Sequence, residues 1–67
     1  MKKNPWKQME EGLRHYGAMQ PHVFDETIRY VKDGIPYDDV LTSATEELGK
    51  EELIRRIEEL RKEVVAE

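Results

Sequence analysis

The sequence of 67 residues contains no cysteine, so no disulfide bond can stabilise its fold. A chain this short buries only about 60% of the surface that its unfolded form exposes, and natural domains of this size often rely on a disulfide, a metal or self-association. With no cysteine and only two histidines, self-association is the additional stabiliser that we expect. The missing cysteines also suit a reducing cytoplasm, which is the compartment that we predict.

Long apolar runs are missing as well. No stretch approaches the roughly 20 apolar residues that a membrane-spanning helix needs, and we expect no membrane partner. We expect no secretory signal, because Lys2 and Lys3 are followed by Asn4-Pro5-Trp6 and not by an apolar segment. Of all residues, 39% are charged and 37% are hydrophobic, but the hydrophobic ones recur at regular spacing, which indicates a folded chain.

The residue patterns of common catalytic, metal and nucleotide sites are absent. The four glycines are isolated, so they form no glycine-rich phosphate loop. Ser43 does not lie in a Gly-x-Ser-x-Gly motif. His22 and Asp25 would place two metal ligands on one face of a helix, but a structural metal site needs about four. We therefore expect no enzyme activity, no small-molecule substrate, and no metal or other cofactor.

Proline and glycine divide the sequence into four segments whose apolar residues have helical spacing. Asn4-Pro5 is typical of a helix start, because asparagine caps a helix and proline fits its first position. Proline likewise opens the second and third segments, and a glycine follows each of the first three. We predict an all-α fold, a small bundle of four short helices in a single domain (residues 1–67), over residues 5–16, 21–33, 36–48 and 50–65.

The boundary between the third and fourth helices has two interpretations. In the first, Gly49 ends the third helix. In the second, the third helix breaks at Thr42, and Ser43 and Glu46 form a capping box that starts a longer helix. Helices three and four would then be partly merged. The sequence favours the first interpretation.

The apolar residues of the four helices predict one small core. Gly17 is well placed to end the first helix, whereas Gly12 lies inside it at a cost of about 1 kcal/mol relative to alanine. We attribute Gly12 to the close approach of another helix. The predicted core consists of Trp6, Leu13, Phe24, Ile28, Leu41, Leu48, Leu53 and Ile57.

The last helix carries the clearest amphipathic pattern. Its apolar residues recur at spacings of four, three and four, and nearly everything between them is charged, which predicts a narrow apolar stripe. The stripe spans barely two heptads, too few for an independent coiled coil. We expect it to begin against the chain's own core and to leave its far end for a partner. The predicted interface residues are Leu53, Ile57, Leu60, Val64 and Val65.

We therefore predict a non-catalytic protein-interaction module, a small cytoplasmic regulator, inhibitor or assembly adaptor. It would self-associate, with a dimer favoured, or bind another protein through its last helix. Aromatic residue types that favour interfaces support this prediction. They are Trp6, Tyr16, Tyr30 and Tyr37.

The alternative is a small dimeric transcriptional regulator that contacts DNA with its basic N-terminal region. The candidate contacts are Lys2, Lys3, Lys7 and Arg14. Four positive charges are a weak basis for phosphate binding in a chain whose net charge is −4. The second and third helices have the outline of a helix-turn-helix, but Asp38 and Asp39 at the start of the third would repel phosphate. Nucleic-acid binding is therefore the less favoured prediction.

Overall fold

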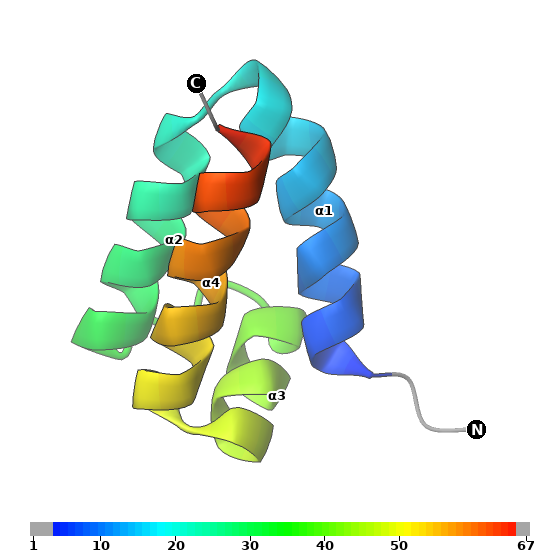
Figure 1. Cartoon of the computed structure of the whole chain (residues 1–67). Coiled ribbons are helices and arrows are strands. Elements are labelled where there is room, and N and C mark those ends of the chain that lie inside the picture. Colours follow the sequence, from blue (N-terminus) through cyan, green and yellow to red (C-terminus); the bar gives the residue numbers. More distant parts are fainter. Residues whose placement is uncertain (1–3, 66–67) are drawn as a thin grey trace.

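The computed structural model describes residues 4–65, which form four helices joined by short links (Figure 1). They are α1 (Pro5–Met19), α2 (His22–Asp33), α3 (Asp39–Leu48) and α4 (Lys50–Val64). The predicted all-α bundle of four short helices is confirmed. Within the described residues, no helix combines the length and the apolar content that crossing a bilayer requires.

The other three helices pack on α4. In Figure 1, α1 and α2 run in opposite directions, α4 lies along both of them, and α3 crosses one end of the bundle. α4 contacts each of the other helices, whereas α2 and α3 barely touch one another. The shortest extent of the molecule is 18 Å. Because packed helix axes lie about 8–10 Å apart, this thickness corresponds to two layers of helices.

Ten apolar side chains from all four helices form the buried core, and among residues 4–65 no polar or charged residue is buried with them. Two of the predicted core residues, Trp6 and Leu48, are only partly buried and pack against the edge of the core. The core consists of Met9, Leu13, Phe24, Ile28, Val31, Leu41, Ala44, Leu53, Ile57 and Leu60.

Two predicted helix ends have the expected capping geometry. The Asn4 side-chain oxygen accepts hydrogen bonds from the backbone N–H groups of Trp6 (3.0 Å) and Lys7 (3.3 Å), and Pro5 occupies the first helical position. At the end of α2, Gly34 adopts the left-handed conformation with φ of 69°. Its N–H and that of Ile35 donate to carbonyls of the last turn, which satisfies backbone groups that the helix leaves unpaired.

The predicted start of the third helix at Pro36 is wrong, because α3 begins three residues later. Asp38 is its N-cap, with an extended backbone and a carboxylate that accepts the Leu41 N–H at 2.7 Å. A helix that started at Pro36 would lose this charged cap at the positive end of the helix dipole. The later start keeps Tyr37 outside the helix, in the link that follows α2.

The prediction that Gly17 ends the first helix is wrong. Gly17 lies inside α1 and is buried. A Cβ atom at this position would overlap the end of the Phe24 ring, which is fully buried. Glycine is therefore required for the close approach of α1 and α2, and the helix continues to Met19. The predicted close approach at Gly12 is wrong, since an added Cβ there meets nothing within 4 Å.

α3 and α4 are separate helices, so the partly merged alternative is wrong. Gly49 has φ of 86° and ψ of 154°, a backbone conformation that residues other than glycine rarely adopt. This conformation ends the helical path between Leu48 and Lys50. Ser43 lies inside α3 and caps no helix. α4 ends at Val64, one residue before the predicted end.

The two glycines of α1 provide a matched stability test. Gly12→Ala is expected to stabilise the protein by about 1 kcal/mol, because alanine favours the helix and the added methyl group meets open space. Gly17→Ala gains the same propensity but forces its methyl group against Phe24, which costs about 1–3 kcal/mol. The difference between the unfolding free energies of the two variants, measured in urea by circular dichroism, gives the cost of forcing the methyl group against Phe24. Equal stabilities of the two variants would contradict it.

Candidate functional site

The structure places the predicted interface of the last helix mainly in the interior. Leu53 and Ile57 are fully buried, and Leu60 is 2% exposed, so a partner cannot touch these three side chains in this fold. These side chains are buried because α4 packs against α1, α2 and α3 at once. Val64 and Val65 are half-buried and pack against the core.

Of the predicted basic contacts, the structure describes Lys7 and Arg14, both in α1. Lys2 and Lys3 lie outside the described residues, and Lys7 is exposed at the start of α1. The Arg14 guanidinium donates to carboxylates of Glu10 (3.2 Å) and Glu63 (3.1 Å), and these hydrogen bonds raise the pKa of Arg14. A guanidinium already paired with two carboxylates is a weak phosphate ligand.

The two histidines lie on the surface of the protein. His15 lies edge-on to Tyr16, with ring centroids 4.9 Å apart, and both histidines are exposed. Residues 4–65 contain no group of three histidine or acidic side chains that would hold a metal ion.

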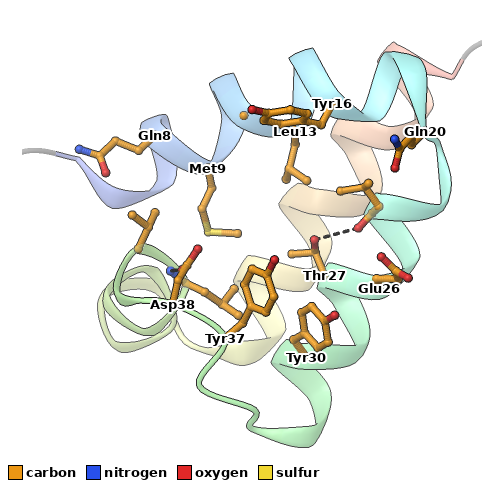
Figure 2. Close-up of a pocket in the computed structure, with 14 residues that line it drawn as sticks. Gln8, Met9, Leu13, Tyr16, Gln20, Glu26, Thr27, Tyr30, Tyr37 and Asp38 are labelled. Carbon is orange, nitrogen blue, oxygen red and sulfur yellow. Dashed lines mark hydrogen bonds between the residues drawn. The ribbon is translucent and has the colours of Figure 1, made fainter.

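A groove of about 580 Å³ lies between α1, α2 and the start of α3 and is here called the α1–α2 groove (Figure 2). It lies where α2 and α3 barely touch, and none of its lining residues comes from α4. Figure 2 shows Met9 and Leu13 pointing from α1 into it. Apolar side chains form its floor, namely Met9, Leu13, Val23, Val40 and Leu41.

The wall of the groove on α1 is an uncharged row with a gap. Gln8, Gly12, Tyr16 and Gln20 follow one another at four-residue spacing, which places them along one side of the helix. Gly12 leaves a gap between Gln8 and Tyr16, because it has no side chain and nothing else occupies the space above it. This glycine is explained neither by a turn nor by a close helix contact.

The opposite wall is aromatic and acidic. Tyr30 of α2 and Tyr37 of the α2–α3 link stack with ring centroids 4.8 Å apart and planes 10° apart. The left-handed turn at Gly34 brings the link back against α2 and so makes this pairing possible. Tyr37 is 64% exposed and Tyr16, across the groove, is 58% exposed. Among residues 4–65, the hydroxyls of these tyrosines form no hydrogen bond with another side chain or with the backbone.

The only charged side chains lining the groove among the described residues are two acids, Glu26 and Asp38. Glu26 takes part in no ion pair with another described residue. Asp38 uses one oxygen to cap α3. Thr27 presents little polarity to the groove, because its hydroxyl donates to the Val23 carbonyl of its own helix at 2.8 Å.

Part of the exposed surface of α4 differs from the groove because it carries a network of paired charges. The Glu52 carboxylate accepts hydrogen bonds from Arg56 and Arg55, each at 2.8 Å, and these bonds lower the pKa of Glu52. Arg56 also lies over the Trp6 ring, 5.7 Å from its centroid. These contacts give the Glu52, Arg55 and Arg56 side chains partners within the protein itself.

No family model, curated protein or solved structure matches this chain. The groove was not predicted from the sequence, although its three tyrosines were recognised as residue types that favour interfaces. The four-residue spacing of Gln8, Gly12 and Tyr16 was the pattern that could have revealed one wall. The pairing of Tyr30 with Tyr37 depends on the path of the link, which the sequence pattern does not give.

Leu60→Asp tests the burial of the α4 stripe. We expect global unfolding, because a lost leucine side chain and a buried carboxylate together cost about 3–5 kcal/mol, comparable to the whole stability of a small domain. Circular dichroism at 25 °C measures the loss of helicity. Val65→Asp, at the half-buried end of the stripe, should keep most of the helicity. A helical Leu60→Asp chain would contradict the burial of this residue.

The ion pairs of Glu52 predict a pH dependence. Because its pKa in the folded chain is lowered from the ordinary value of 4.5, its stabilising effect is complete above that value and is lost as the pH falls through the lowered pKa. Glu52→Gln should therefore reduce the decline of the unfolding free energy between about pH 6 and 3. Glu58→Gln is the control, since Glu58 forms no ion pair among the described residues. Identical pH profiles for both variants would contradict the prediction.

Proposed function

We propose that this protein is a non-catalytic interaction module that receives a segment of a partner protein in the α1–α2 groove. The observation that carries the proposal is an apolar floor bordered by exposed tyrosines on a face that no other part of the described chain covers. Apolar floors with aromatic edges are typical of surfaces where a few residues supply most of the binding free energy. A role as a small regulator, inhibitor or assembly adaptor fits such a surface.

The chemistry of the groove favours binding over catalysis. General acid–base catalysis uses carboxylates whose pKa is shifted by enclosure. Glu26 and Asp38 are both exposed, and one of them caps a helix. The tyrosine hydroxyls and glutamine amides of the groove can form hydrogen bonds with a ligand. The lining residues among positions 4–65 do not include a serine, cysteine or histidine that would form a nucleophile–base pair. A reducing cytoplasm remains the compartment that we propose for a chain without cysteine.

The proposed docking site replaces the α4 stripe that the sequence favoured. Because Leu53, Ile57 and Leu60 are needed for the core, self-association through them would require the chain to open. A chain this small still needs a stabiliser besides its core. A bound partner provides that stabilisation because it binds only the folded state. A partner in the groove would thus link binding to stability.

Photocrosslinking tests the proposal on the whole chain. With benzoylphenylalanine in place of Tyr37, irradiation in a lysate of cells that naturally make the protein should give one dominant adduct. An excess of unlabelled chain should suppress it. An excess of the Gly12→Leu chain should not, because leucine would fill the gap in the α1 wall. Gly12→Leu should be at least as stable as the natural chain, since leucine favours a helix over glycine by roughly 0.5–1 kcal/mol.

The control places the photoreactive residue at Glu58, on the exposed surface of α4. We expect no dominant adduct from this position. The proposal fails if positions 37 and 58 give the same adducts, or if the Gly12→Leu chain competes as well as the natural one. An adduct with twice the mass of the chain would identify the occupant as a second copy.

A further inference from the structure

We propose that the occupant of the α1–α2 groove is an amphipathic helix of another protein, about three turns long, with lysine or arginine along one flank. This inference rests on the proposed function and specifies the chemistry of the partner. The length follows from the α1 wall, where the row from Gln8 to Gln20 extends about 18 Å at 1.5 Å per residue. A helix of about 12 residues has the same length.

The form of the groove suits a helix because its α1 wall is a row with a regular gap. Helices pack by placing the ridge of side chains of one into the groove between the ridges of the other. The empty space at Gly12, between Gln8 and Tyr16, is suited to one large apolar side chain of the occupant. Further apolar side chains, three or four residues before and after it, would then lie over Met9 and Leu13.

The charge of the groove is asymmetric, and this asymmetry selects the flank of the occupant. The α1 wall is uncharged, whereas Glu26 and Asp38 lie on the side of α2 and the α2–α3 link. No basic residue lines the groove within residues 4–65. A cationic flank facing α2 is therefore complementary, and an acidic flank would meet like charge. Glu26 should contribute more than Asp38, because the latter also caps α3.

The tyrosine pair provides a second feature that favours a cation. One face of Tyr37 is stacked on Tyr30, and the ring remains 64% exposed, so its other face is open to a ligand. A guanidinium or ammonium group over that face would gain a cation–π contact beside the Asp38 carboxylate. The chain already contains such a contact, between Arg56 and Trp6.

The same charges disfavour a second copy of the chain as the occupant. In a twofold-symmetric dimer through this face, the groove of one copy meets the groove of the other. Glu26 and Asp38 of both copies would then be brought into one interface with no basic lining residue to compensate them. A basic helix from a different protein avoids this repulsion.

The test is a selection from a displayed library of 14-residue helical peptides with randomised flank positions, performed on the full chain. The Gly12→Leu chain serves for counter-selection, so that only peptides bound in the groove are retained. We expect the enriched families to show an excess of lysine and arginine on one flank. The control for the library is the composition of the unselected pool.

The acidic wall is then tested with variants that keep the fold. Glu26→Gln and Asp38→Asn remove the charges, and asparagine preserves the helix cap. Each should weaken a selected basic peptide about two- to five-fold, as expected for exposed charge pairs, and added salt should reduce the difference. The matched control is a chain with Glu47→Gln and Glu58→Gln, which has the same net charge as the doubly substituted groove variant but an unchanged groove.

The outcomes separate the two proposals. Peptides that bind the natural chain but not Gly12→Leu, and that show no excess of basic residues, would overturn this inference and leave the proposed function standing. A selection that enriches no groove-dependent peptide would overturn both. Sedimentation equilibrium completes the test, because a dimer of the natural chain that Gly12→Leu dissociates would show that the groove holds a second copy.

Discussion

The packing of the other helices depends on the apolar stripe of α4. Leu53, Ile57 and Leu60 are among the most deeply buried side chains, and α4 is in contact with all three other helices. α2 and α3 barely touch, so their relative positions are set largely through α4 and α1. Exposed ion pairs join the same helix to its neighbours, from Arg61 to Asp25 of α2 and from Arg14 of α1 to Glu63. Exposed pairs of this kind contribute little, so apolar burial dominates the assembly.

The sequence was informative about helices because their periodicity and caps are local properties. Asn4 and Pro5 define a helix start through residues that lie next to one another, and Gly34 ends a helix by its own backbone freedom. Pro36 was misleading because two start sites compete within three residues. The helix starts at the second site, where the Asp38 carboxylate accepts a hydrogen bond from the Leu41 N–H. Residue spacing alone does not reveal how strong this hydrogen bond is, so it could not decide between the two start sites.

Glycine shows most clearly what spacing cannot supply. A glycine is compatible with a helix end, a close contact or an open space, and which of these applies depends on residues distant in sequence. Gly17 was interpreted as an end and is a close contact with Phe24, while Gly12 was interpreted as a close contact and faces open space. The groove escaped prediction for the same reason, since Tyr30 and Tyr37 become one wall only after the link has turned at Gly34.

The unused space at Gly12 connects stability with the groove. A folded chain of this size has only about 0.05–0.15 kcal/mol of stability per residue, so the roughly 1 kcal/mol that a glycine costs inside a helix is a substantial fraction. Neither the turns nor the packing of α1 requires it. Natural proteins depart from locally optimal residues at functional sites, so the open gap at Gly12 supports the binding function that we propose for the groove. A stabilising residue at this position would close the space into which we propose that a partner's side chain packs.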